Sequence, residues 1–292
     1  MKVLITGASG QLGQALFRNR LDNFSLMLPS RNDLDLANEE SCRSFIKENK
    51  PHWIINAGAY TNVEMAEENT REAFLVNTKA VSCFVEEIAK YNGSILQIST
   101  DYVFNGNFSK PINPLTSCDP LNYYGYTKLE AEKIVSNYPN SIIIRTSWLY
   151  GPIGKNFFLT IHKLLNNKEK NESIEIVCDQ IGCPTSADSL SKACWHSLKI
   201  NNLPKILHWS DLGSASWYDF AFYIRKILKD TNLLYNPPLI KPTKSANFFT
   251  KAKRPYYSVL DCWESYKCLN LKTNHWTFEL EKVVNQYIQA NG

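Results

Sequence analysis

The stretch MKVLITGASGQLG, residues 1–13, decides the fold. A short apolar run is followed by three glycines, Gly7, Gly10 and Gly13. Apolar residues at helical spacing follow this loop. Glycines allow a tight turn and a close approach of the backbone to a pyrophosphate, while the next helix offers free N–H groups at its N-terminus. The stretch predicts a dinucleotide-binding loop. Its GxxGxxG spacing departs from the usual GxGxxG, so an ordinary glycine-rich turn is the alternative.

Beyond this loop, short apolar runs alternate with helical patterns as far as residue 150. Such alternation is typical of a parallel sheet with helices on both faces, so we predict an α/β, doubly wound, Rossmann-type fold. After Gly151 the pattern becomes less regular and richer in proline, which favours a smaller C-terminal lobe. We expect residues 1–150 plus 186–212 to bind the dinucleotide, and residues 151–185 plus 213–292 to bind a substrate.

Composition excludes several classes of function. The 32 basic and 28 acidic residues leave a net charge of +4 with no basic stripe, so we expect no nucleic-acid partner. None of the eight cysteines forms a CxxC pair, and no histidine cluster accompanies them, so we expect no metal site. No apolar run reaches the length of a membrane span, and the chain is expected to be cytoplasmic.

The loop itself is expected to contact the cofactor through Gly7, Gly10, Gln11, Leu12 and Gly13. Small residues at the end of the third strand leave room for the same ligand: Ala57, Gly58 and Ala59.

Cofactor choice depends on the end of the second strand. Arg31 could pair with a 2′-phosphate, which favours NADPH over NADH, although a surface arginine without a ligand is the alternative. Asp35 and Leu36 could border the adenine, but Asp35 could equally cap the next helix.

Tyr124 and Lys128 are four residues apart at the start of a predicted helix, so they share one face. A nearby ammonium lowers the pKa of a tyrosine, which would suit Tyr124 to proton donation. The fourth strand ends at Ser99 and Thr100. We expect the Thr100 hydroxyl, with Ser99 as the alternative, to bind the substrate carbonyl oxygen to which Tyr124 would donate its proton. Tyr-x-x-x-Lys pairs are common by chance. The hypothesis that this pair is catalytic therefore depends on its following the glycine loop and the hydroxyl-bearing strand end in that order along the chain.

Several longer motifs resemble the dTDP-4-dehydrorhamnose reductases, a family of extended short-chain dehydrogenases. These motifs are NAGAYTNVEMAE (56–67), STDYVFNG (99–106), PLNYYGYTK (120–128), RTSWLYG (145–151), DQIGCPT (179–185) and RPYYSVLD (254–261). They cover nearly the whole chain in the family's order.

The resemblance implies reduction of the 4-keto group of dTDP-4-dehydro-L-rhamnose to dTDP-L-rhamnose by NADPH or NADH. It implies Thr100, Tyr124 and Lys128 as the catalytic set, with Tyr124 as proton donor. It also implies a set of residues that contact the dTDP-sugar: Thr100, Asp101, Tyr102, Trp148, Asn156 and Arg254.

Two departures from the family pattern matter. Glu64 stands where many members have Asp, and Gln14-Ala15 replaces an acidic residue that some members use in a metal-linked dimer. We therefore expect neither that metal nor that dimer, while a homodimer of another kind stays open.

Three alternatives stay open: a reductase of another nucleotide-deoxysugar, an epimerase of such a sugar, and a non-catalytic regulatory subunit like that of methionine adenosyltransferase. Asp101-Tyr102 argues against a dehydratase, which commonly has Asp-Glu there. The late tryptophans, Trp217 among them, are expected in the core.

Overall fold

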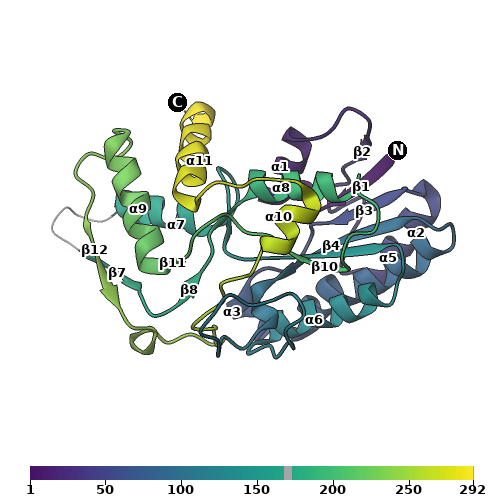
Figure 1. Cartoon of the computed structure of the whole chain (residues 1–292), viewed down its shortest axis with the longest axis horizontal. Helices are drawn as coiled ribbons and strands as arrows, with labels where there is room; N and C mark the ends of the chain where they lie inside the picture. Colours follow the sequence, from purple (N-terminus) through teal and green to yellow (C-terminus); the bar gives the residue numbers. More distant parts are fainter. Residues whose placement is uncertain (168–172, 292) are drawn as a thin grey trace.

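The computed structural model describes residues 1–167 and 173–291 and has a parallel six-stranded sheet at its centre (Figure 1). The strands lie in the order β10-β5-β4-β3-β1-β2. Their bounds are β1 (Lys2–Thr6), β2 (Ser25–Met27), β3 (Trp53–Asn56), β4 (Ser94–Thr100), β5 (Ser141–Thr146) and β10 (Ile206–His208). Strand β1 has β2 on one side and β3 on the other, so the order reverses beside the glycine loop. The predicted fold class is confirmed, and such a reversal leaves a crevice at the carboxyl ends of the strands.

Helices cover both faces of this sheet, because alternate strand residues point to opposite sides. On one face, Val3 and Ile5 pack with α1 (Gln11–Arg18) and α8 (Ala187–Ser197). On the other face, Leu4 packs with three helices: α2 (Glu39–Asn49), α5 (Ala80–Ala89) and α6 (Tyr123–Ser136). Figure 1 shows the two helix layers above and below the strands.

The residues between 73 and 88 lie on a divided helix. Helix α3 (Val63–Ala66) precedes α4 (Thr70–Phe74), which continues through a π-helical turn, η1 (Leu75–Lys79), into α5. Within η1, the Asn77 side chain accepts from the Tyr60 N–H at 2.8 Å and donates to the Tyr60 carbonyl. The π-helical turn thus ties the loop after β3 to the helix layer.

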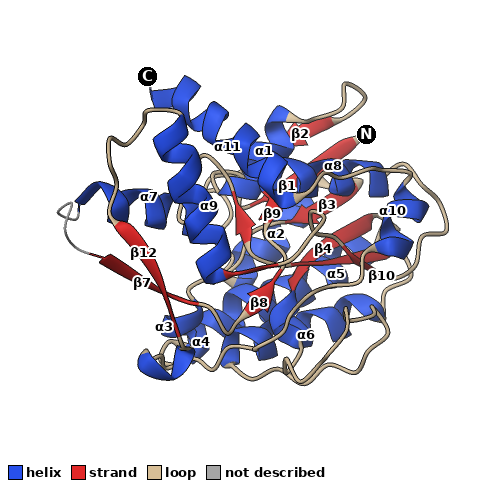
Figure 2. Ribbon diagram, turned by 60° about the vertical axis from the view of Figure 1, so that its left-hand side comes forward, coloured by secondary structure: helices blue, strands red, loops and turns tan. Residues whose placement is uncertain are grey.

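Smaller elements build a second group around their own apolar core, which includes Tyr150, Phe158, Phe220 and Trp276. Three two-stranded sheets pair β6 with β9, β8 with β11 and β7 with β12; Figure 2 shows the last pair at the edge of the molecule. The bounds are β6 (Leu149–Tyr150), α7 (Phe157–Asn167), β7 (Ser173–Val177), β8 (Ile181–Gly182), β9 (Thr185–Ser186), β11 (Ala215–Ser216), α9 (Trp217–Asp230), β12 (Leu239–Thr243) and α11 (Trp276–Asn291). The remaining helix, α10 (Trp263–Leu269), packs instead against α8 and β10 beside the central sheet. The described residues also form the 3₁₀ turns η2 (Asp101–Val103) and η3 (Ser245–Asn247).

The chain passes between the two groups more than once. After β5 it forms β6 to β9, and then returns with α8 and β10 to the central sheet, where β10 pairs with β5. Trp195 on α8 donates its indole N–H to the Leu16 carbonyl at 3.0 Å and so joins α8 to α1. Strand β10 has only three residues, one of them the buried His208, which gave no strand signal in the sequence.

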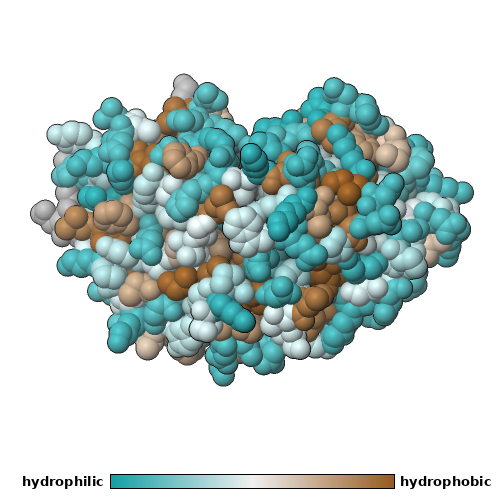
Figure 3. Space-filling model, viewed as in Figure 1, coloured by the Kyte–Doolittle hydropathy of each residue, from teal (hydrophilic) through white to brown (hydrophobic). Residues whose placement is uncertain are grey.

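The surface carries no broad apolar area on the face drawn in Figure 3, where hydrophilic side chains surround small hydrophobic groups. The outline of that face is notched along its upper edge, between α11 and the layer of α1 and α8. None of the helices in the described residues is both long enough and apolar enough to cross a membrane.

Candidate active site

Two adjoining cavities follow the carboxyl edge of the central sheet. The larger has a volume of about 530 Å³ and the smaller about 240 Å³. Both are lined by Gly7, Ser9, Gly58 and Ala59, so the glycine loop separates and connects them. The crevice is therefore long enough to have two chemically different ends, one beside β2 and one beside β4 and β5.

The glycine loop has the close packing that its sequence predicts. Gly7 has φ +63°, and a Cβ there would lie 2.7 Å from the Cα of Gly58. A Cβ on Gly13 would lie 2.3 Å from the Gly7 carbonyl oxygen. Gly10 precedes the first turn of α1, and its N–H donates to the Gly7 carbonyl at 2.9 Å. The loop therefore presents bare backbone and the N-terminus of α1 to the cavities, which fits a diphosphate.

Gln11 and Leu12 also line the larger cavity. The Gln11 amide donates to the Leu149 carbonyl at 3.2 Å and accepts from the Asn156 amide at 3.2 Å. Gln11 thus joins the start of α1 to the segment that follows β5.

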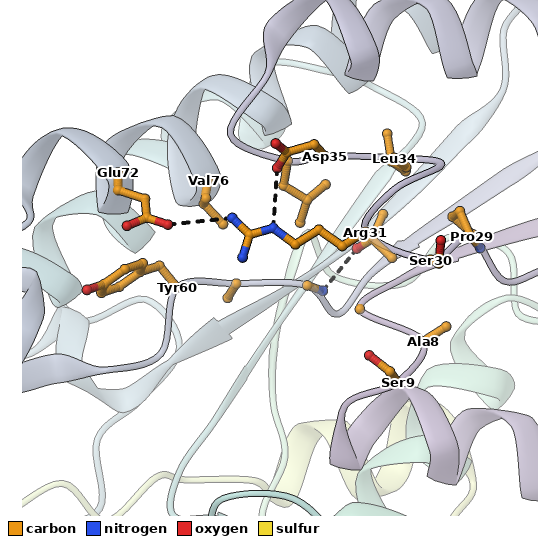
Figure 4. Close-up of a pocket in the computed structure, with 15 residues that line it drawn as sticks. Ala8, Ser9, Pro29, Ser30, Arg31, Leu34, Asp35, Tyr60, Glu72 and Val76 are labelled. Atoms are coloured by element: carbon orange, nitrogen blue, oxygen red, sulfur yellow. Dashed lines mark hydrogen bonds and ion pairs between the residues drawn. The ribbon is translucent and has the colours of Figure 1, made fainter.

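The smaller cavity is lined by Arg31, Asp35, Leu36 and Ala59, as the sequence predicts for an adenosine end, and also by Glu72, which the sequence did not indicate. The Arg31 guanidinium lies 3.7 Å from a carboxylate oxygen of Asp35 and 3.7 Å from one of Glu72. Figure 4 shows both carboxylates directed at the guanidinium. Asp35 does not cap the next helix: Asn38 is the N-cap of α2.

A chain of buried hydrogen bonds crosses the sheet beneath the crevice. The Gly58 N–H donates to the Thr6 hydroxyl at 2.9 Å, and this hydroxyl donates to the Asn56 amide oxygen at 2.6 Å. The Asn56 amide donates to Gln97 at 2.8 Å, and the Gln97 amide donates to the Ile98 carbonyl at 2.7 Å. These hydrogen bonds link the ends of β1, β3 and β4, and no local sequence pattern indicated them.

Tyr124, Lys128 and Thr100 line the larger cavity together. Asn122 caps α6 by accepting from the Gly125 N–H, and a Cβ on Gly125 would lie 2.1 Å from the Tyr102 carbonyl oxygen. This close approach seats the start of α6 against η2. The rings of Tyr102 and Tyr124 consequently meet edge to face, with centroids 6.0 Å apart.

The electrostatics of this pair differ from the sequence expectation. Burial raises the pKa of Tyr124 above its usual value, and a hydrogen bond with Thr100 only partly opposes that shift. Burial lowers the pKa of Lys128 to about 8, against the attraction of Glu132. The predicted lowering of the Tyr124 pKa is therefore wrong for this structure, because loss of water on burial is the largest influence on the phenol. Tyr124 is a neutral phenol near pH 7.

The end of β4 supplies further polar groups to the larger cavity. The Thr100 hydroxyl donates to Asp101 at 3.1 Å and accepts from the Tyr102 N–H at 3.2 Å. Burial raises the pKa of Asp101 to about 6, while hydrogen bonds with Ser258 and Thr100 favour its carboxylate. Within the described part of the chain, the buried hydroxyls of Ser99 and Thr146 lack protein partners, and both residues line this cavity. Buried hydroxyls of this kind are suited to a polar ligand.

Two tryptophans form a wall of the larger cavity. The indoles of Trp148 and Trp217 stack with centroids 3.4 Å apart and planes 3° apart. Trp148 has φ +45°, and a Cβ on Gly182 would lie 2.5 Å from its ring, so Gly182 leaves room for the indole. Trp217 lines the cavity and is only partly buried, which corrects its expected place in the core.

Asn156 and Arg254 do not line either cavity. The Asn156 amide donates to the Gly151 and Ile153 carbonyls, and its oxygen accepts from the Leu159 N–H in the first turn of α7. Lys155, its neighbour, lines the larger cavity instead. The structure thus occupies the Asn156 side chain with local contacts, and its expected contact with the sugar stays a prediction.

Arg254 is likewise engaged by protein groups. Its guanidinium donates to Glu64 at 2.7 Å, and a hydrogen bond with Tyr102 connects it to the cavity wall. The Glu64 carboxylate also accepts from the Lys251 N–H at 2.8 Å. Glu64, noted above as a departure from the family pattern, therefore ties the loop after β12 to α3. The described residues contain no group of three or more side chains suited to a metal ion.

Known proteins share this architecture. A family model described as RmlD substrate binding domain matches residues 1–289. A dTDP-4-dehydrorhamnose reductase of Aggregatibacter actinomycetemcomitans is 34% identical and aligns with 97% of this chain and 98% of its own length.

Two solved structures agree with this result. A dTDP-4-dehydrorhamnose reductase of Clostridium acetobutylicum has a TM-score of 0.90 at 33% identity, over 98% of this chain and 99% of its own. One from Bacillus anthracis, in complex with NADP, has a TM-score of 0.88 at 31% identity, with the same coverage. The resemblance predicted from the motifs is confirmed, and the chain belongs to the RmlD substrate binding domain family.

Proposed function

We propose that this chain is an NADPH-dependent dTDP-4-dehydrorhamnose reductase, which reduces the C4 ketone of dTDP-4-dehydro-L-rhamnose to give dTDP-L-rhamnose. One observation carries the proposal: Thr100, Tyr124 and Lys128 line the cavity onto which the glycine loop opens. The near full-length similarity to a reductase of that name supports the choice of substrate.

The crevice fits a nicotinamide dinucleotide. Gly7, Gly10, Gln11, Leu12 and Gly13 would hold the diphosphate, and the smaller cavity would hold the adenosine between Arg31, Asp35 and Leu36. Ala57, Gly58 and Ala59 would line the path between the two ends. When bound, the reduced cofactor supplies the hydride. The complex of the Bacillus anthracis relative with NADP supports NADPH, with NADH as the second choice.

Tyr124 would act as the proton donor. Its raised pKa keeps the phenol protonated near pH 7, so the O–H can donate to the ketone oxygen of the substrate. The single hydrogen of the Thr100 hydroxyl is donated to Asp101 in this structure, so the hydroxyl would have to turn from Asp101 to donate a second hydrogen bond to the same oxygen. When Tyr124 gives up its proton, it is left as a phenolate. The Lys128 ammonium, which lines the same cavity, would stabilise this negative charge.

The sugar nucleotide would enter from the second group of elements. Asp101 and Tyr102 would lie beside the sugar, and the Trp148–Trp217 stack would offer it an apolar wall. Arg254 could reach a diphosphate only by leaving Glu64, and the local contacts of Asn156 suit it better to positioning the loop after β6.

The test is the loss of reduced-nicotinamide absorbance with dTDP-4-dehydro-L-rhamnose, run once with NADPH and once with NADH. Turnover with either would support the proposal. No turnover in protein that binds NADPH would point to another nucleotide-deoxysugar, as reductase or epimerase. No turnover with any such sugar would favour the regulatory-subunit alternative.

Three further expectations remain proposals. The division into residues 1–150 plus 186–212 and the remainder can be tested by limited proteolysis. A homodimer can be tested by sedimentation velocity, and a cytoplasmic location by fractionation of cells that express the chain.

A further inference from the structure

The side chains around the smaller cavity carry more negative than positive charge, which disfavours the binding of an anion. Its lining includes one cationic side chain, Arg31, and two carboxylates, Asp35 and Glu72. Both carboxylates lie 3.7 Å from the guanidinium, on different nitrogens, as Figure 4 shows. Any anion that binds Arg31 must therefore approach a guanidinium already paired on two sides.

The two carboxylates differ in how they are held. Asp35 accepts from the Ala37 N–H at 3.0 Å, and the Asp35 N–H bonds the Ser41 hydroxyl, so Asp35 shapes the loop before α2. Glu72 belongs to α4 and reaches across the cavity from the opposite side to Asp35. Its side chain is 45% exposed, so its charge can be removed with little effect on packing.

We propose that Glu72 is a cofactor-selectivity residue: its carboxylate competes with the 2′-phosphate of NADPH for Arg31 and so keeps NADH usable. The inference rests on the proposed function. A 2′-phosphate carries up to two negative charges and is repelled by Glu72, whereas a neutral 2′-hydroxyl can donate a hydrogen bond to a carboxylate. Glu72 on α4 would thus weaken the preference for NADPH that Arg31 provides.

The expected size of the effect is modest because all three side chains reach solvent. Screened competition between the Glu72 carboxylate and the 2′-phosphate for the Arg31 guanidinium corresponds to a change in NADPH affinity of about three- to ten-fold. The Glu72→Gln variant should therefore raise the ratio of the NADH to the NADPH dissociation constant by that factor. Most of the change should come from tighter NADPH binding.

The experiment measures binding of each reduced cofactor to the full chain by fluorescence titration, without any sugar. The variants are Glu72→Gln, Arg31→Ala and the double variant. The matched control is Glu130→Gln, which removes one charge from an exposed pair with Lys133 on α6. Thermal unfolding of each variant establishes that it is folded.

A ratio in Glu72→Gln that equals the ratio in Glu130→Gln would overturn the inference. An undiminished gain from Glu72→Gln in the Arg31→Ala background would also overturn it, because competition for Arg31 requires Arg31. Failure of the unmodified chain to bind either cofactor would instead count against the proposed function.

Discussion

The Lys128 ammonium donates to the main-chain carbonyl of Ile98 at 2.6 Å. The same carbonyl accepts from the Gln97 amide at the end of the buried chain that begins at Gly58. The lysine of the proposed catalytic set is therefore docked on the strand end that carries Thr100. Its position depends on side chains from three strands, and not only on its spacing from Tyr124 along α6.

Replacing Tyr124 by Phe should reduce turnover by about 10²–10⁴-fold, because it removes the proton donor while keeping the ring. NADPH binding should stay unchanged, since the phenyl group still fills the same space. The measurement is steady-state reduction alongside a cofactor titration. Tyr126→Phe, on the same helix but 41% exposed, is the matched control. A near-normal rate in Tyr124→Phe would remove its assigned role.

The pH dependence should carry the signature of Lys128. Burial lowers the pKa of this lysine from 10.5 to about 8, so the ammonium is present below that pH and is lost above it. If the ammonium assists Tyr124, kcat/KM should fall as pH rises through about 8. The pH–rate profile checks this, with Lys128→Met expected to be slow and to lack that fall. A profile of the unmodified chain that stays flat to about pH 10 would contradict it.

Stability should follow the same group in the opposite sense. Between its folded pKa of about 8 and its unfolded value of 10.5, Lys128 binds fewer protons in the folded state. Its contribution to the free energy of unfolding should therefore rise with pH across this window. Urea unfolding of the unmodified chain and of Lys128→Met, at several pH values, measures the contribution of Lys128 to the free energy of unfolding. Identical slopes for the two proteins would show that Lys128 does not contribute.

Gly13→Ala should weaken NADPH binding by about ten-fold or more, because overpacking of this size costs about 1–3 kcal/mol. The added Cβ would lie 2.3 Å from the Gly7 carbonyl oxygen, so the loop would have to shift. Gly151→Ala is the control, since its Cβ would meet its nearest neighbour at 3.5 Å. Fluorescence titration measures both; equal affinities would mean that the loop tolerates the shift.

Gln97→Leu should lower the free energy of unfolding by about 1–3 kcal/mol, because it leaves the buried Asn56 amide without its acceptor. Urea unfolding measures the loss, and Gln289→Leu on the exposed side of α11 serves as the control. If both variants lost the same amount, the chain of hydrogen bonds would contribute little to stability.

The sequence predicted the elements that local patterns determine. Tyr124 and Lys128 lie in the first half of a helix, as predicted, and the glycine loop lies between the expected strand and helix. Local spacing was sufficient there because caps, glycines and apolar periodicity lie within a few residues of one another.

Contacts between distant segments could not be predicted in the same way. Thr6, Asn56 and Gln97 are unremarkable in three separate strands, and only the register of the sheet makes them neighbours. Glu72 faces Arg31 because α4 and the loop after β2 both line the smaller cavity, which no spacing reveals. The family resemblance singled out Asn156, but it did not reveal the local hydrogen-bond partners of that side chain.

The late return of the chain to its first sheet has a consequence for synthesis. During translation, β1 to β5 leave the ribosome before α8 and β10, with all of β6 to β9 between them. Until α8 is synthesised, α1 is the helix that can cover Val3, Ile5 and Ile144 on that face of the sheet. Until β10 is synthesised, one edge of β5 stays unpaired. The nascent chain should therefore need protection from aggregation until about residue 208 has emerged. A ribosome stalled between β5 and α8 would hold an apolar sheet that is open on one face.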